Sequence, residues 1–368
     1  MKNLIAALCC IPLISAGQQK QTASKIENVI VITSDGLRWE EVFKGMDVAI
    51  NADHKFNQGH EDSAASVKAY WAENETERRK KLMPFFWSTL IAKGQLYGNR
   101  TFDNKVDVAN PYWFSYPGYN EIFTGYPDTA VNSNEYKPNP HTTVLEYINQ
   151  QPAFKGKVAA FGAWEAFDRI LNKDRAGFTV VSAFNPTPGN NLSPKQKLVN
   201  SMLKDSFKPF GSAECLDVFT HYAAMEYLQQ KKPRVLYISY GETDEWAHAG
   251  RYKNYLDAIN QVDTWVKDIW NYVQSTPQYK DKTAILITCD HGRGDKVKSE
   301  WTSHGSEISD SHEIWFALLG PGIPAKGEAK TSMQVYQKQF AQTIAQLLGL
   351  QYKANHPIAD AVKEITIK

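Results

Sequence analysis

Two pairs of metal-ligand-type side chains stand at the ends of apolar runs. Asp290 and His291 directly follow the run TAILITC, and Gly292 after them leaves both side chains free to turn into a cleft. Asp244 and His248 follow the run RVLYISYG, and a spacing of four residues puts them on one side of a helical turn, within reach of one metal ion. Because the Asp-x-x-x-His spacing also occurs on solvated helices, the Asp-His pair is the stronger indication of a metal site.

Further ligand-type residues extend this set. Asp35 follows the run NVIVITS and precedes Gly36, a residue that permits an unusual backbone angle at the end of a strand. His304 in EWTSHGSEI adds an imidazole, and His312 later in the chain competes with it for the same role. Carboxylates and imidazoles together suit borderline divalent cations. The set therefore predicts two metal ions in one cleft.

One hydroxyl group stands in a setting that could activate it. Ser115 lies in NPYWFSYPGYNEIFTGYPD, two residues before Pro117 and ahead of a short helical stretch that stops at Gly125. Ser is favoured as an N-cap and Pro in the first helical turn, so Ser115 is predicted at a helix N-terminus. Backbone amides and the positive end of the helix dipole can hold a phosphate there and favour an alkoxide. A serine that only caps a helix would show the same local pattern.

The elements that must position these residues are short apolar strands. Each candidate run is rich in β-branched residues, and long helical patterns lie between the runs. We therefore expect an α/β fold, a three-layer α/β/α sandwich with a mostly parallel central sheet, and a ligand site beyond the carboxyl ends of the strands. The predicted strands are NVIVITS ending at Ser34, KVAAFG at 157–162, RVLYISYG ending at Gly241, TAILITC ending at Cys289 and IWFALLG at 314–320.

Three other stretches define the organisation of the chain. Residues 1–17 have the layout of a secretory signal peptide, with an apolar stretch shorter than the roughly 20 residues that span a bilayer. We therefore expect residues 18–368 to form a single catalytic domain that is exported, to the periplasm or as a secreted protein. Residues 44–82 are polar and irregular and predict a surface excursion or lid. Residues 335–350 have apolar positions at helical spacing and predict a packing helix.

The charge and cysteine content narrow the classes of partner. The formal net charge is +1, with 41 basic and 40 acidic residues scattered along the chain, so no surface for nucleic acid or an anionic membrane is evident. We expect a small or locally recognised substrate, and the sequence leaves the oligomeric state open. Cys9 and Cys10 would leave with the signal, and we expect Cys215 and Cys289 to be free thiols.

The order Asp, Ser, Asp-x-x-x-His, Asp-His, His resembles the alkaline phosphatase superfamily, from SDGLR to the GPG at 320–322. Within it, SYPGYNEIFTG resembles the nucleophile segment of the type I phosphodiesterase and nucleotide pyrophosphatase branch, in its hydroxyl residue, the Pro two residues later and the closing Thr-Gly. The string HGSE resembles the final metal histidine of that branch, which favours His304 over His312.

The resemblance implies two divalent metal ions, usually Zn²⁺ and in some relatives Mn²⁺. It also implies an asparagine that holds a phosphate oxygen, and in VNSNEY we prefer Asn134 to Asn132. Arg38, Tyr116, Trp113 and Trp164 are our candidates for the substrate pocket. The resemblance assigns Asp244, His248 and His304 to one metal ion, and Asp35, Ser115, Asp290 and His291 to the other.

The function implied is a metal-dependent phosphoester hydrolase, a phosphatase or phosphodiesterase, that forms a phosphoserine intermediate on Ser115. A sulfatase is the nearest alternative, but the sequence from Ser115 to Tyr119 lacks the Arg of the sulfatase pattern C/S-x-P-x-R. Three histidines also suit transition metals better than the single calcium of a sulfatase. A phosphoglycerate mutase would need a second inserted domain, which the chain does not suggest. A metal-binding protein without turnover is a third alternative.

Overall fold

The computed structural model of the protein describes residues 26–57 and 59–365. The predicted signal peptide at 1–17 lies outside the described residues. Within the described part of the chain, none of the helices combines the length and the apolar character that crossing a membrane requires. Cys215 and Cys289 are both buried and unpaired, as predicted.

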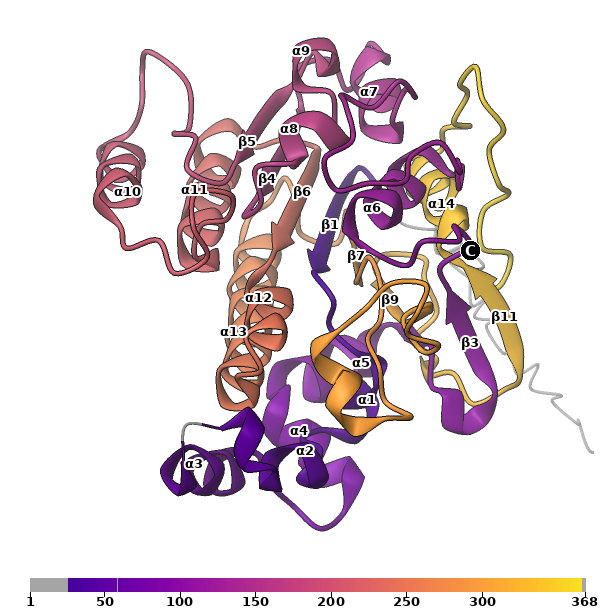
Figure 1. Ribbon diagram of the computed structural model, residues 1–368. Helices are drawn as coiled ribbons and strands as arrows, with labels where there is room; N and C mark the ends of the chain where they lie inside the picture. The colour runs from indigo at the N-terminus through magenta and orange to yellow at the C-terminus, as the bar shows by residue number, and fades with distance from the viewer. Residues whose placement is uncertain (1–25, 58, 366–368) are drawn as a thin grey trace, which may run out of the picture.

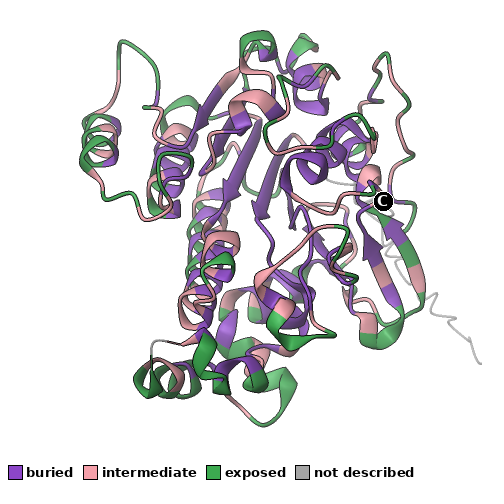
Figure 2. Cartoon of the chain, in the orientation of Figure 1, coloured by how far each residue is buried: buried purple, intermediate pink, exposed green. Residues whose placement is uncertain are grey.

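Eight strands form the central sheet, in the order β10-β2-β9-β7-β1-β6-β4-β5 (Figure 1). β1 pairs in parallel with both β6 and β7, and β6 continues in parallel to β4 and β5. Figure 2 shows the central strands buried along their length, as their continuous apolar sequences predict. The strands of this sheet are β1 Asn28–Ser34, β2 Gln95–Tyr97, β4 Val158–Gly162, β5 Thr179–Ser182, β6 Val235–Tyr240, β7 Thr283–Thr288, β9 Phe316–Leu319 and β10 Gly327–Glu328.

Helices cover both faces of this sheet, so the predicted α/β/α sandwich with a mostly parallel sheet is confirmed. The parallel strands are joined by crossover connections, which are almost always right-handed. From β1 the chain crosses to β4 and β5 on one side of the sheet order, and from β5 it returns to β6 and then passes β1 to reach β7. The helices are α1 Trp39–Lys44, α2 Val48–Ala52, α3 His60–Tyr70, α4 Glu75–Leu82, α5 Ile91–Lys93, α6 Ser115–Thr124, α7 Val144–Gln150, α8 Phe167–Ile170, α9 Lys173–Ala176, α10 Pro194–Asp205, α11 Asp217–Lys231, α12 Glu242–His248, α13 Tyr252–Ser275 and α14 Phe340–Leu347.

The crossover directions place α6 to α9 on one face and α11 and α13 on the other. The connections that follow β1 and β6 therefore run to opposite faces of the sheet. Because loops on both sides diverge at such a point, the carboxyl ends of these three strands form the natural ligand crevice of the sheet. All the predicted ligands at strand ends follow β1, β6 or β7.

Three local predictions need refinement. The 44–82 stretch is mostly helical instead of irregular, because Asp47 and Asn74 cap α2 and α4 with their side chains, and its role as a surface excursion or lid stays a prediction. The run at 314–320 forms β9, which is antiparallel to β7, and a short strand β8 (Glu313–Ile314) before it. In the 335–350 segment the helix begins only at Phe340, since Val335 belongs to β11 (Met333–Tyr336) in a second sheet with β3 (Asn104–Asp107) and β8.

Candidate active site

Asp35 follows β1 directly and lies at the centre of the site. The next residue, Gly36, has a positive φ of 57°, and its backbone N–H donates to Asp290 Oδ1 at 3.1 Å. A Cβ atom on Gly36 would lie only 2.7 Å from Asp244 Oδ1. Glycine is therefore required here both for its backbone angle and for the close approach of the three carboxylates.

Ser115 is the first residue of α6, so its prediction at a helix N-terminus agrees with the structure, although Phe114 occupies the N-cap position. Its Oγ lies 3.2 Å from His291 Nε2. The helix can approach β7 this closely because Gly118 faces the strand end: a Cβ atom there would lie 2.4 Å from the carbonyl oxygen of Asp290. The hydroxyl is thus held at the carboxyl end of the sheet, next to the Asp-His pair.

His291 is fully buried and has a defined tautomer. Its Nδ1 lies 2.9 Å from the carbonyl oxygen of Gly292, which can only accept a hydrogen bond, so Nδ1 carries the proton. In the neutral imidazole the lone pair is therefore on Nε2, which lies 3.3 Å from Asp35 Oδ1 and 3.5 Å from Asp290 Oδ2. A neutral imidazole of this tautomer is a metal ligand with its outer nitrogen already satisfied.

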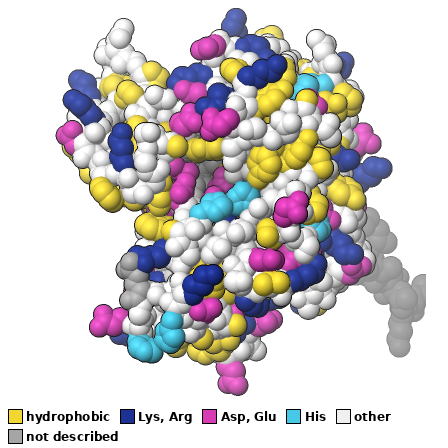
Figure 3. Space-filling model, viewed as in Figure 1, with side chains coloured by type: hydrophobic (Ala, Val, Ile, Leu, Met, Phe, Trp, Pro, Cys, Tyr) yellow, Lys and Arg dark blue, Asp and Glu magenta, His cyan; other side chains and the backbone are white. Residues whose placement is uncertain are grey.

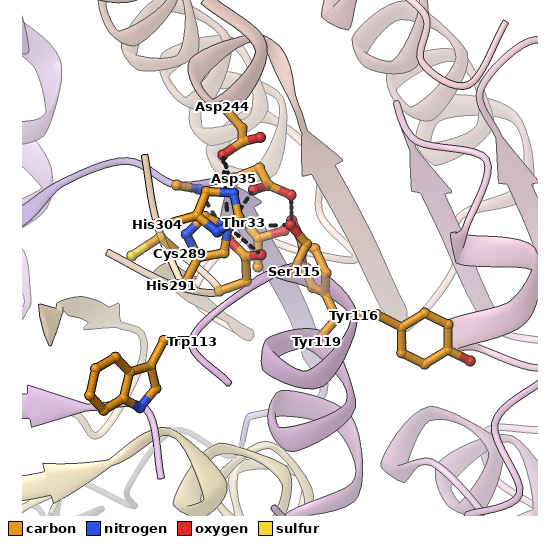
Figure 4. A network of polar contacts seen from close by, with 12 residues as sticks. Thr33, Asp35, Trp113, Ser115, Tyr116, Tyr119, Asp244, Cys289, His291 and His304 are labelled. Atoms are coloured by element: carbon orange, nitrogen blue, oxygen red, sulfur yellow. Dashed lines mark hydrogen bonds and ion pairs between the residues drawn. The ribbon is translucent and has the colours of Figure 1, made fainter. Parts of the chain in front are cut away.

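A second group of ligand atoms adjoins the first. Asp244 and His248 both lie on α12, and His248 Nε2 is 3.0 Å from Asp244 Oδ2. His304 contributes its Nε2 at 3.8 Å from Asp244 Oδ1 and 2.9 Å from His248 Nε2. The rings of His291 and His304 stack with centroids 3.9 Å apart, which joins the two groups (Figure 4).

The ligand atoms of this cluster lie close enough together to bind cations, and some of them lack a partner within the protein. Asp35, Asp290 and His291 form one compact set of possible ligands, and Asp244, His291 and His304 form another, among the described residues. Asp35 Oδ1 and Asp290 Oδ2 are buried without a hydrogen-bond partner. Buried polar atoms normally have a partner, and carboxylates held this close repel each other. The donor set therefore fits divalent metal ions with nitrogen and oxygen ligands.

The electrostatics of the cluster agree with this interpretation. Burial, together with the charge of Asp35, raises the pKa of Asp290 well above its usual range. Burial lowers the pKa of His291, but the charges of Asp290 and Asp35 outweigh it and raise this pKa to about 9. In the absence of a cation, Asp290 and His291 therefore tend to bind protons. A bound metal ion would take the place of these protons.

The chain is similar to known metalloenzymes in part of its sequence and in its fold. Residues 215–351 match the family model of the metalloenzyme superfamily. A search of curated proteins by sequence found no match. Among solved structures, the alkaline phosphatase PafA superposes with a TM-score of 0.63 at 10% identity, covering 94% of this chain and 99% of that one. The chain has the alkaline phosphatase fold.

Other structures with this fold carry different activities in their names. A putative sulfatase from Bacteroides thetaiotaomicron superposes with a TM-score of 0.60 at 15% identity, covering 90% of this chain and 72% of that chain. A lipoteichoic acid synthase from Listeria monocytogenes superposes with a TM-score of 0.51 at 13% identity, covering 89% and 73%. The resemblance to the alkaline phosphatase superfamily is thus confirmed, whereas the phosphodiesterase branch stays a prediction.

Within the alkaline phosphatase fold, the predicted ligands are brought together as expected. Figure 4 shows the side chains of Asp35, Ser115, Asp244, His291 and His304 converging at one point. His312 lies elsewhere: its Nε2 is 3.7 Å from Asp107 Oδ1, and its ring packs on Trp113. The geometry therefore favours His304 over His312.

Asn134 lies beside the N-terminus of α6. Its Oδ1 accepts the backbone N–H of Tyr116 at 3.0 Å, so its amide nitrogen remains a donor that can turn to a ligand near Ser115. Asn132 is exposed. This arrangement agrees with the choice of Asn134 over Asn132.

Two predicted substrate-pocket residues do not line a pocket. The Arg38 side chain is fully buried, because it pairs with Glu41 three residues later and donates to the carbonyl oxygen of Gly294 at 2.8 Å. Tyr116 is also fully buried and donates its hydroxyl to the carbonyl oxygen of Lys137. Figure 4 shows its ring pointing away from the ligand cluster, as does the ring of Trp113. The predictions for Arg38 and Tyr116 were therefore wrong. Arg38 binds Glu41 and the Gly294 carbonyl oxygen, and Tyr116 is buried in the core.

Two residues of the site escaped the sequence analysis. Tyr119, one helical turn after Ser115, donates its hydroxyl to Asp35 Oδ2 at 2.9 Å. Arg293, two residues after His291, is buried and contacts Asp244 Oδ1 through its Nη2. The four-residue spacing from Ser115 could have revealed Tyr119. Arg293 gave no comparable signal, since its partner lies on a different strand-helix connection.

Proposed function

We propose that this protein is a metal-dependent phosphoester hydrolase that uses Ser115 as its nucleophile. The observation that supports the proposal most directly is the 3.2 Å separation of Ser115 Oγ and His291 Nε2, at the junction of two compact sets of ligand atoms. A helix N-terminus, a hydroxyl and ligands for two cations in one crevice are the parts that phosphoryl transfer through a serine ester requires.

Each side chain has a distinct role in this proposal. Asp35, Ser115, Asp290 and His291 would hold one divalent ion, and Asp244, His248 and His304 would hold the other. When bound, two such ions supply positive charge that favours the serine alkoxide and stabilises the oxygens that carry charge during in-line displacement. Zn²⁺ suits the mixed nitrogen and oxygen donors, and Mn²⁺ is the alternative.

The reaction at Ser115 follows from its position. The Oγ atom attacks phosphorus, the bond from phosphorus to the leaving alcohol breaks, and the phosphoryl group is left on the serine until water hydrolyses it. Backbone N–H groups at the start of α6 and the amide nitrogen of Asn134 are placed to donate to the non-bridging oxygens. The side-chain environment excludes most water, since Ser115 is 5% exposed.

Phosphate esters are preferred over sulfate esters in this proposal for one specific reason. Sulfatases share the fold and require an Arg two residues after the Pro, where this chain has Tyr119. The hydroxyl of that tyrosine is engaged with Asp35. It therefore supports a metal-ligand carboxylate instead of serving the conversion of Ser115 into formylglycine.

The test is to compare Ser115→Ala with the wild type after loading both with zinc. The variant should lose turnover of bis(p-nitrophenyl) phosphate and p-nitrophenyl phosphate by roughly 10³-fold or more, while elemental analysis still finds two ions per chain. Ser306→Ala changes an exposed serine near His304 and is the matched control, expected to keep full activity. Full activity in Ser115→Ala, or turnover of p-nitrophenyl sulfate alone, would contradict the proposal. Export, predicted from residues 1–17, is tested separately by following the protein in fractionated cells.

A further inference from the structure

The stretch between β5 and α11, residues 183–213, projects from the domain, and we call it the α10 lobe. Figure 1 shows α10 on the outer side of α11, at the edge of the molecule. One face of α10 holds the lobe in place. Leu203 is buried in a small cluster with Ala163 and Cys215, and Val199 is partly buried against the main core. The remaining faces of the helix are open to solvent or to a partner.

A second face of the α10 lobe carries apolar side chains that the described part of the chain leaves uncovered. Leu198 is 59% exposed and Met202, four residues later on α10, is 54% exposed, so the two side chains are neighbours on the helix surface. Phe207, just after the helix, is 81% exposed. Phe207 and Leu198 are the two most exposed large hydrophobic side chains among the described residues. Single exposed apolar residues are common on proteins, but three within one short projecting segment indicate a binding surface.

Lysines accompany these apolar side chains. Four lysines and a single acidic residue lie on the α10 lobe, all of them exposed: Lys195, Lys197, Lys204, Lys208 and Asp205. Among the described residues, no carboxylate forms an ion pair with any of the four lysines. The formal net charge of the whole chain, +1, therefore hides a local excess of positive charge on the lobe. Lysine stems can lie along apolar surface while their ammonium groups stay in polar surroundings, so the two features can act together.

The combination of charge and apolar exposure fits an anionic lipid surface. Interfacial helices bind membranes by two contributions, apolar side chains that enter the boundary of headgroups and acyl chains, and lysines that contact anionic headgroups. The α10 lobe offers both, on an element at the edge of the molecule where several side chains can meet a flat surface at once. An acidic protein surface would match the lysines but would leave hydrated carboxylates against the three apolar side chains. The lipid surface is therefore the partner that complements the whole lobe.

The α10 lobe also contacts the helix that carries candidate metal ligands. The ring of Phe210, near the end of the lobe, packs edge-on against the ring of Trp246, with centroids 4.9 Å apart. Trp246 lies on α12, between Asp244 and His248. Figure 3 shows the projecting lobe beside a hollow that has acidic side chains inside it and histidines at its edge. A surface that binds the lobe therefore lies next to the crevice.

We propose that the α10 lobe docks on the surface of an anionic phospholipid bilayer. Leu198, Met202 and Phe207 enter the boundary between headgroups and acyl chains, and the four lysines of the lobe contact the headgroup phosphates. Docking goes beyond the proposed function and does not rest on it, because it requires neither metal ions nor Ser115.

The test is co-sedimentation of the full chain with two kinds of vesicle. One kind contains phosphatidylcholine alone, and the other contains equal parts of phosphatidylcholine and phosphatidylglycerol. We expect the wild type to bind the anionic vesicles about tenfold or more tightly than the neutral ones. Added salt should weaken this binding, because it screens the lysine charges.

Variants separate the apolar and the charged contributions. The triple variant Leu198→Ser, Met202→Ser, Phe207→Ser should bind anionic vesicles about tenfold or more weakly than the wild type, because it removes the side chains that enter the lipid. The double variant Lys197→Gln, Lys204→Gln should lose about tenfold or more through the charge alone. The matched control removes three exposed apolar side chains from other parts of the chain and should bind like the wild type: Val48→Ser, Val67→Ser, Phe102→Ser.

Three results would overturn the docking proposal. The wild type does not bind anionic vesicles, or the triple variant binds them as tightly as the wild type, which would mean that another surface is responsible. Alternatively, light scattering finds a dimer for the wild type and a monomer for the triple variant, which would make this surface a contact between two copies of the chain. Should the triple variant fail to fold by circular dichroism, the double lysine variant decides by the same comparison. Vesicle binding is measured without turnover, so a failure here leaves the proposed function standing.

Discussion

At the scale of single residues, the side chains around the site are oriented by buried hydrogen bonds. Tyr119 donates to Asp35 Oδ2, and its hydroxyl oxygen also lies 3.1 Å from Ser239 Oγ. Ser239 is bonded in turn to Thr33 Oγ1 at 3.0 Å, one strand away. Such outer contacts fix the direction of a metal-ligand carboxylate and leave its second oxygen free for the ion.

Tyr119→Phe tests this role. The change removes the hydrogen bond to Asp35 but keeps the ring, which packs against Phe167. We expect metal affinity to fall by about 10- to 100-fold, with activity largely restored at saturating zinc. Zinc titration monitored by activity and by a chelating dye would measure both quantities. Tyr112→Phe, which alters an exposed hydroxyl contact with the Thr129 carbonyl oxygen, is the control. Unchanged zinc affinity in Tyr119→Phe would show that Asp35 is oriented without it.

At the scale of elements, α6 must be held rigidly because it carries Ser115, the proposed nucleophile. Glu121, in the middle of the helix, is buried and accepts backbone N–H groups from three residues. These are Asn110 at 2.8 Å, Ala109 at 2.9 Å and Lys338 at 2.8 Å. The carboxylate thus ties the helix to the loop before Ser115 and to the segment that leads into α14.

Glu121→Gln should weaken this attachment. Glutamine offers one acceptor oxygen and turns an NH₂ group towards a backbone N–H group, so we expect the free energy of unfolding to fall by about 1–3 kcal/mol. Urea unfolding would measure the loss. Glu135→Gln, an exposed carboxylate beside Asn134, should change stability little. Equal stability of Glu121→Gln and the wild type would mean that the loop adapts to the amide.

A second element, α1, contains a buried carboxyl group, that of Glu40, with an incomplete set of hydrogen-bond partners. Glu40 is 4% exposed and its Oε2 has no hydrogen-bond partner, while Glu41 pairs with Arg38. Burial, opposed by the charge of Arg38, raises the pKa of Glu40 to about 8. The folded state therefore keeps a proton that the unfolded chain has lost, and this carboxyl group reduces the free energy of unfolding as pH rises towards about 8.

Glu40→Gln should therefore change stability in a pH-dependent way. Glutamine resembles the protonated carboxyl group, so at about pH 5 the variant and the wild type should be similar, and at about pH 9 the variant should be more stable by about 4 kcal/mol. Thermal unfolding across this pH range would show it. Glu77→Gln, an exposed change on α4, should show no such dependence. A constant difference across the pH range would contradict a raised pKa.

At the scale of the whole molecule, the site exists because three strands end at one crevice. Asp35, Asp244 and Asp290 come from the connections after β1, β6 and β7, and they repel one another unless cations bind. Any ligand that binds only the folded chain stabilises it by mass action. The metal ions should therefore contribute to the stability of the entire domain.

Removal of metal tests this consequence. We expect chelation to lower the Tm by several degrees and zinc in excess to restore it, since about 100-fold saturation adds roughly 2.7 kcal/mol. Differential scanning calorimetry on chelated and reloaded protein would measure the shift. His304→Ala should show a smaller shift, because one ligand is missing, whereas His312→Ala should respond like the wild type. An identical Tm with and without metal would argue against tight ions in the folded site.

The sequence by itself determined the strands, the positions of the candidate ligands after them and the helix start at Ser115. These features are local: a buried parallel strand is a continuous apolar run, and the residue that follows it lies at the crevice. The superfamily resemblance depended on the same residues. His304 lies beside Asp244 and Asn134 beside the start of α6, so the geometry favours these two residues over His312 and Asn132, and their roles stay predictions.

Only the tertiary structure decided which side chains face the site and which face the core. Arg38 and Tyr116 follow or adjoin ligand residues in sequence, yet both are buried by partners elsewhere. Arg293 joins the site through its contact with Asp244, which lies on the connection that follows β6. Side-chain direction depends on packing between segments far apart in the chain, and a single sequence does not specify that packing residue by residue.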